Sequence, residues 1–144
     1  MSEPPFVDEH AIAVAAPPDA VWAALVHRLG RDMGGAEPFA LLLGCEPARG
    51  TPDFSGGEGE TLPGFRVLAS EPGERLALGG RHRFSDYRLT FVLEEGRLAA
   101  RTHAAFPGLK GRAYRAAVIG SGAHRVITRR ILSGVRRRAE RPGS

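Results

Sequence analysis

Tyr114 and His124 are the residues whose types and spacing are best suited to chemistry. They lie ten residues apart, close to three helical turns, so that on one helix their side chains would share a face. A phenol and an imidazole facing an apolar cavity would fix a carbonyl group and move a proton near neutral pH. The alternative is that both polar groups bond to nearby backbone and fill the core.

Two further polar side chains are predicted to reach the same cavity. Tyr87 lies on the apolar face of a predicted strand at 84–95, and Phe91 follows on the same face. His82 alternates with Leu78 on the preceding strand. The competing interpretation for Tyr87 and His82 is a packed position in the core. We take Tyr87, His82 and Phe91 as candidate ligand contacts.

Small residues on the next predicted strand, 97–106, would leave room for a bound molecule. Ala100 and Thr102 alternate with charged residues and are predicted to face the apolar side. They complete the candidate ligand-binding set. His103 falls on the charged face, and His10 stands beside two acidic residues, so both are predicted to be solvent-exposed.

Several other kinds of site are excluded by the pattern. Ser85 is not part of a nucleophile elbow, and Arg125 stands where a dinucleotide fingerprint beginning at Gly120 would need its third glycine. The five histidines lack metal-ligand spacing, and the single Cys45 excludes an internal disulfide and a cysteine-built metal site. We therefore expect neither a cofactor nor a metal.

The first third of the chain is predicted to contain a strand, two helices and a loop. The strand spans 6–15, and Pro18 begins a helix that stops at Gly30. Trp22 on that helix is predicted to pack against the sheet. A short helix or turn follows at 39–43. The Pro/Gly-rich segment 47–64 is predicted to be a loop that covers a pocket.

The rest of the chain is predicted to form closely spaced strands and one long helix. Strands at 65–71 and around Leu76–Leu78 precede the two strands already named, which implies an antiparallel meander. Apolar residues then recur at steps of three or four over 109–139, which indicates an amphipathic helix. Gly120, Ser121 and Gly122 are predicted to kink or break that helix, since glycine costs about 1 kcal/mol in a helix interior.

Length and composition indicate one domain. The chain has 144 residues, of which 42% are hydrophobic, so we predict a single domain over 1–144 with an ordered core at about 6–140. It lacks an apolar run of the roughly 18–20 residues that span a membrane. The acidic N-terminal segment does not resemble a signal peptide. We therefore expect a cytoplasmic protein with no membrane span.

Charge is divided between the two ends of the sequence. Residues 1–60 hold three Arg and ten acidic residues, whereas residues 97–144 hold twelve Lys or Arg and one Glu. The basic segment is either a solvated helix face or an interaction surface, which would use Arg125, Arg129, Arg130, Arg136, Arg137 and Arg138. It lacks the interleaved aromatic residues of a base-stacking platform, which argues against a nucleic-acid partner.

Two segments carry a resemblance to a known superfamily. They are residues 12–22 (IAVAAPPDAVW), and Gly111-Arg112-Ala113-Tyr114 followed ten residues later by His124. The first is similar to the opening strand and first helix of the START-like, or SRPBCC, superfamily of polyketide cyclase-like proteins, and the second is similar to the last helix of its uncharacterised bacterial members. Where a Pro-Phe-His would be expected there, this chain has Gly122-Ala123-His124. The resemblance covers roughly residues 6–140.

The resemblance implies an α+β helix-grip fold. In that fold a curved antiparallel sheet wraps around a long C-terminal helix, short helices follow the first strand, and a ligand cavity lies between sheet and helix. It hosts binding, transport and catalysis alike. Our first hypothesis is therefore a protein that binds a small apolar or aromatic molecule. The alternatives are a cyclase- or dehydratase-like enzyme using His124 and Tyr114, and an interaction module using the arginine-rich helix. The sequence is also compatible with a homodimer.

Overall fold

Six antiparallel strands form one curved sheet in the computed structural model, which describes residues 4–33, 37–120 and 122–141. The strand order is β1-β6-β5-β4-β3-β2, so the last strand in sequence lies between β1 and β5. The strands are β1 (Phe6–Ala13), β2 (Thr61–Leu62), β3 (Phe65–Glu71), β4 (Arg75–His82), β5 (Ser85–Glu94) and β6 (Arg97–Ala105). Alternation of apolar and polar residues predicted the meander from β3 to β6, and this prediction is confirmed.

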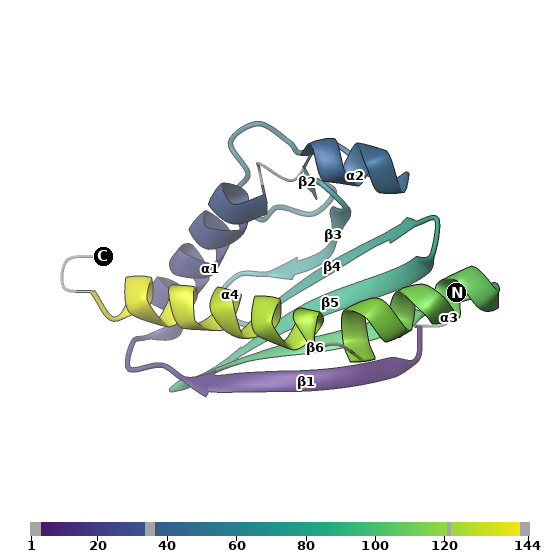
Figure 1. Ribbon diagram of the computed structural model, residues 1–144. Helices are drawn as coiled ribbons and strands as arrows, with labels where there is room; N and C mark the ends of the chain where they lie inside the picture. The colour runs from purple at the N-terminus through teal and green to yellow at the C-terminus, as the bar shows by residue number, and fades with distance from the viewer. Residues whose placement is uncertain (1–3, 34–36, 121, 142–144) are drawn as a thin grey trace.

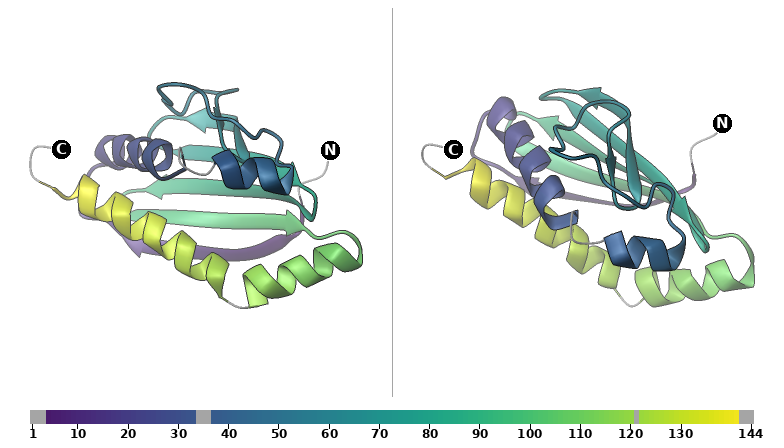
Figure 2. Two further views of the ribbon diagram at one scale, coloured as in Figure 1. Left: turned by 45° about the horizontal axis from the view of Figure 1, so that its top comes forward. Right: turned by 90° about the horizontal axis from the view of Figure 1, so that it is seen from above.

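All the helices cover the same face of the sheet (Figures 1 and 2). They are α1 (Pro18–Met33), α2 (Glu37–Leu43), α3 (Gly108–Arg115), a π-helical turn (Ala116–Gly120) and α4 (Ala123–Ala139). This arrangement, a curved antiparallel sheet gripping a C-terminal helix, is the predicted α+β helix-grip fold. None of these helices is long and apolar enough to cross a membrane.

Helix α1 begins at Pro18, as predicted, because proline is suited to the first helical position. The predicted stop at Gly30 is wrong. Met33, one turn beyond Leu29, packs against the hydrophobic core, and this contact favours continuing the helix past the glycine. Trp22 on the same helix is half-buried against that core, where it was predicted to pack.

The C-terminal helix is not one continuous element. Helix α3 passes into the π-helical turn, and α4 begins after Gly122, whose φ of 83° is left-handed. A left-handed residue ends a helix, so the predicted break is confirmed at Gly122; Ser121 lies outside the described residues. The two helices consequently diverge in direction (Figure 1).

The hydrophobic core lies where α1 crosses α4 over one end of the sheet. Leu25 and Leu29 of α1 and Val135 of α4 have no exposed surface. They pack against sheet residues that are equally buried: Leu76, Leu78, Phe91 and Leu98. Removing such side chains from water supplies most of the driving force for folding. This end of the sheet is therefore filled.

Gly80 in β4 allows the segment before β3 to approach the sheet. A Cβ atom at this position would lie 2.1 Å from the carbonyl oxygen of Gly64 and 3.0 Å from the Tyr87 hydroxyl. At the neighbouring Gly79, a Cβ atom would lie 2.6 Å from the end of the Leu68 side chain and at an ordinary contact distance of 3.6 Å from the Tyr87 carbonyl oxygen. Backbone atoms cannot move aside as the end of a side chain can. Glycine is therefore required at position 80 but not at position 79.

We expect Gly80→Ala to lower the free energy of unfolding by about 1–3 kcal/mol, because the added methyl group overpacks against fixed backbone. Gly79→Ala is the matched control and should cost clearly less, since the Leu68 side chain can move. Urea denaturation of the two variants measures the difference. Equal losses of stability would contradict the assignment of Gly80 as the constrained position.

Candidate functional site

A cavity of about 350 Å³ lies beyond the C-terminal end of α1, between the sheet and helices α2, α3 and α4. Its walls are mainly apolar: Met33, Ala40, Leu43, Pro63, Gly64, Phe65, Leu89, Ala104, Phe106, Ile119, Ile127 and Ile131. The helix break helps to build it, because Ile119 in the π-helical turn and His124 at the start of α4 both line it.

Five of the seven predicted ligand contacts line this cavity: Tyr87, His82, Tyr114, His124 and Thr102. The other two do not. Phe91 and Ala100 are cross-strand partners in β5 and β6, and both are buried in the hydrophobic core. Phe91 lies four residues beyond Tyr87, or about 13 Å along the strand, which places it in the part of the sheet that α1 and α4 cover.

Tyr87 is held at the wall by the segment that precedes β3. Its hydroxyl donates a hydrogen bond to the carbonyl oxygen of Gly64 at 2.6 Å, and the Cys45 sulfur lies 4.0 Å away. Burial raises the pKa values of both the Tyr87 phenol and the Cys45 thiol. Tyr87 therefore stays neutral, and its oxygen retains lone pairs that can accept a hydrogen bond.

His82 and Tyr114 meet within a group of aromatic rings. Their centroids are 4.8 Å apart in an edge-to-face arrangement, and Tyr114 stacks on Phe84 at 5.4 Å. Nδ1 of His82 accepts a hydrogen bond from the Phe84 amide at 3.1 Å, so the neutral ring carries its proton on Nε2. Burial lowers the pKa of His82, against a smaller opposing effect of Asp86. His82 is thus a neutral donor.

His124 is bonded to the first strand. Its Nε2 lies 3.1 Å from the Thr102 hydroxyl and 3.4 Å from Oδ1 of Asp8. The second oxygen of Asp8 lies 3.2 Å from Nε2 of His10. A carboxylate that bonds one nitrogen of an imidazole fixes the ring's orientation. The other nitrogen of His124, Nδ1, is then the one available to a ligand.

Sequence reasoning missed Asp8 and misplaced His10. The His10 side chain is 14% exposed, and Asp8 pairs with Thr102 in the sheet, so both face inward. Their alternation with Ile12 in β1 was the signal that could have placed them, because alternate residues share one face of a strand. His103, predicted to be exposed, is half-buried and packs edge-to-face against Phe6. Cys45 and Ile127 were also missed.

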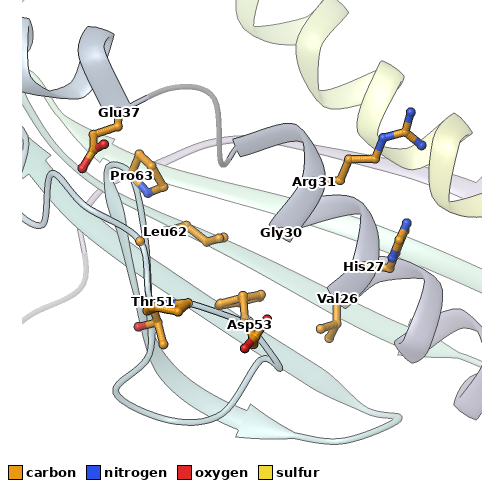
Figure 3. A pocket seen from close by; sticks show the side chains of 12 residues that line it. Val26, His27, Gly30, Arg31, Glu37, Thr51, Asp53, Leu62 and Pro63 are labelled. Carbon is orange, nitrogen blue, oxygen red and sulfur yellow. The ribbon is translucent and has the colours of Figure 1, made fainter.

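The segment 47–64 does not lie across the cavity as a whole. Only its last residues, Pro63 and Gly64, line it. The middle of the segment lies beside α1 and borders a second hollow of about 500 Å³, where Asp53 and Thr51 face Val26 (Figure 3). Among the residues that the structure describes, no group of three or more His, Cys, Asp or Glu residues is placed to hold a metal ion.

We expect His82 to make stability depend on pH. Its folded pKa lies below the ordinary value of about 6.5, so the unfolded chain binds the proton more readily. The contribution of His82 is therefore complete above about pH 6.5 and is lost as the pH falls below it. Urea midpoints measured between pH 7.5 and about 5 should decline less in His82→Gln than in the wild type. Parallel declines in the two proteins would contradict a neutral, half-buried His82.

Two solved structures superpose over nearly the whole chain. Protein MLL2253 from Mesorhizobium loti does so with a TM-score of 0.54 and 16% identity, over 95% of this chain and 98% of that one. Protein CV1439 from Chromobacterium violaceum has a TM-score of 0.53 and 15% identity, over 90% and 96%. The di-domain ARO/CYC protein BexL, from the BE-7585A biosynthetic pathway, has a TM-score of 0.49 and 16% identity, over 97% and 47%.

Comparison with protein-family models and with curated proteins finds no match. The two superpositions above a TM-score of 0.5 have 15–16% identity, and at that level they bear on the fold alone. Together with the strand order and the C-terminal helix, they support the fold assignment. The chain has the α+β helix-grip fold that the resemblance in its sequence implies.

Proposed function

We propose that the chain binds a small apolar or aromatic molecule in the cavity between the sheet and helices α2, α3 and α4. The observation that carries the proposal is an apolar space of about 350 Å³ with a few polar groups on its walls. Ligand sites typically have this character and a volume of about 300–1,000 Å³. Apolar walls favour a ligand body without formal charge, since burying an unpaired charge is costly.

The polar groups suggest how such a ligand is oriented. On the side of β4 and β5, Tyr87 offers an acceptor and His82 a donor, and both are neutral. On the side of β6 and β1, His124 is held by Thr102 and Asp8. We infer a ligand with oxygen or nitrogen atoms at two separated positions on an apolar frame. Each bond would add specificity because an unmatched buried polar group is penalised.

Filling the cavity should abolish binding. Ala104 is buried and lines the cavity, whereas Ala105 lies on the opposite face of the same strand and borders an outer groove. We expect Ala104→Phe to weaken binding of the neutral aromatic probe phenylnaphthylamine at least about tenfold, equal to about 1.4 kcal/mol, as the new ring takes the ligand's place. Probe fluorescence and native mass spectrometry measure this loss.

Ala105→Phe is the matched control, because it adds the same ring to the same strand outside the cavity. It should bind the probe as the wild type does. Retention of binding by both variants, or an equal loss in both, would place the site elsewhere and overturn the proposal. Thermal unfolding of each variant first establishes that it is folded.

A second candidate function is proton-transfer catalysis of the cyclase or dehydratase type. One observation favours it: Asp8 and Thr102 orient the imidazole of His124, which lines the cavity together with Tyr114. An oriented imidazole can act as general base or acid, and a phenol can stabilise a developing oxyanion. In this proposal Nδ1 of His124 removes a proton from the ligand, and Tyr114 donates a hydrogen bond to the oxygen that gains charge.

His124→Gln separates catalysis from binding. An enzyme should retain unreacted substrate in this variant, so the molecule released from it by denaturation should differ from that of the wild type in mass after a dehydration, or in chromatographic retention after a cyclisation. The matched control is His10→Gln, which alters the other histidine bonded to Asp8 but not one that lines the cavity. A bound molecule with unchanged mass and unchanged chromatographic retention in His124→Gln would contradict catalysis and leave the binding proposal standing.

A further inference from the structure

Helix α3 lies beside one end of the sheet and meets the rest of the molecule along one narrow stripe (Figure 2). Gly111 is the only buried residue of this helix, all of which the structure describes, and Tyr114 is half-buried. Residues three apart lie on the same face of a helix. The remaining residues of α3 are exposed to solvent. The position of the helix against the sheet is therefore determined chiefly at Gly111 and Tyr114.

Gly111 lies against backbone at the end of the sheet. A Cβ atom at this position would lie 2.6 Å from the carbonyl carbon of Phe106, 2.9 Å from its oxygen and 3.1 Å from the carbonyl oxygen of Phe84. Phe84 precedes β5 and Phe106 follows β6, and these strands remain paired as far as Asp86 and Ala105. The two carbonyl groups are thus neighbours, and only a residue without a side chain can rest on both.

The same two phenylalanines contact Tyr114 through their rings. Tyr114 stacks on Phe84 with the centroids 5.4 Å apart, and the Phe106 ring lies 6.4 Å away. The Tyr114 ring meets His82 edge-to-face at 4.8 Å, and the Phe84 amide donates a hydrogen bond to Nδ1 of His82. Gly111, Tyr114 and His82 are therefore all placed by contacts with Phe84.

We propose that Gly111 is a positioning residue for the ligand site: its close approach to the end of the sheet holds the Tyr114 ring against His82. Tyr114 and His82 both line the cavity, so the placement of this ring limits how far a ligand extends toward β4. That limit on the ligand rests on the proposed function, whereas the positioning of Tyr114 does not.

A methyl group at position 111 would displace the helix and the ring together. Carbon atoms in ordinary contact are about 3.5–4.0 Å apart, so relieving the approach to the Phe106 carbonyl carbon requires a shift of about 1 Å. The guanidinium group of Arg115 lies 5.5 Å from the centre of the Phe106 ring, but this side chain is exposed and can follow the helix. Tyr114, on the same face as Gly111, would be drawn away from His82. Alanine would otherwise favour the helix more than glycine does.

NMR titration of the histidine ring protons tests the positioning without any ligand. In the wild type burial lowers the pKa of His82, and Asp86 opposes this effect, while the nearby Tyr87 stays neutral. In Gly111→Ala the pKa of His82 should rise toward its ordinary value of about 6.5, because the displaced Tyr114 ring covers it less. The ring-proton resonances of His82 should shift as well.

Gly134→Ala is the matched control, because it adds the same methyl group to a buried glycine of α4 that does not line the cavity. Its Cβ atom would lie 2.4 Å from the guanidinium carbon of Arg28, at the end of a side chain that can move. His82 should titrate in this variant as in the wild type. A folded Gly111→Ala protein with the wild-type pKa and resonances of His82 would overturn the proposal. An unchanged pKa in Tyr114→Leu, which removes the ring and leaves Gly111 in place, would also overturn it.

A double-variant cycle tests whether Gly111 acts on the ligand through Tyr114. Gly111→Ala should weaken binding of phenylnaphthylamine at least about fivefold, but less than about twofold when Tyr114→Leu is already present, because both changes then affect one contact. Equal losses in the two backgrounds would contradict a role through Tyr114. A wild-type protein that does not bind the probe contradicts only the proposed function, and the His82 titration then decides this inference alone.

Discussion

The packing of α1 between α4 and the sheet determines which part of the molecular interior is filled by side chains. Leu25 and Leu29 have no exposed surface, and they fill the space over the end of the sheet that carries Phe91 and Leu98. At about 1.5 Å per residue, the sixteen residues of α1 reach only about 24 Å. Beyond Met33 the sheet is covered by the short α2 and by the broken helix, and the volume between these layers is not filled. One end of the layered structure thus stabilises the fold, and the other holds the cavity.

The interior and the surroundings of the cavity differ in electrostatic character. Tyr87 and His82 remain neutral because burial opposes their charged forms, and their hydrogen bonds to backbone leave one acceptor and one donor for a ligand. Outside, nearly all the cations of α3 and α4 are exposed to solvent. An uncharged molecule would therefore be more stable inside the cavity than a charged one. The same helices separate these two environments.

The periodicity of apolar residues predicted the helices and strands well, but it did not predict where the space between the sheet and the helices is filled. Alternation in β5 and β6 assigned Tyr87, Phe91, Ala100 and Thr102 to one face, and all four lie on it. It could not show that α1 covers the Phe91 end and leaves the Tyr87 end open, because that depends on where one helix crosses another. The contacts among the aromatic rings around Tyr114 could not be predicted either, because α3 and β4 are distant in sequence.

Asp8 shows a different kind of limit. It stands beside Glu9 and His10 in a segment that reads as polar surface, and its role becomes apparent only when β1 is paired with β6 and covered by α4. The helix break was easier to predict, because three small residues in succession disfavour a helix locally. The sequence therefore predicts local conformational preferences, but it does not predict which residues a polar side chain contacts.

The bond between Asp8 and His124 joins segments 116 residues apart in the chain. Contacts of such long range are entropically expensive to form early, so they tend to appear late in folding. During synthesis the first strand leaves the ribosome long before α4 is made, and the neighbour of β1 in the sheet, β6, is also made after the other five strands. The β1 strand therefore stays unpaired until β6 has emerged, and the polar side of the cavity is assembled only after α4 has been synthesised.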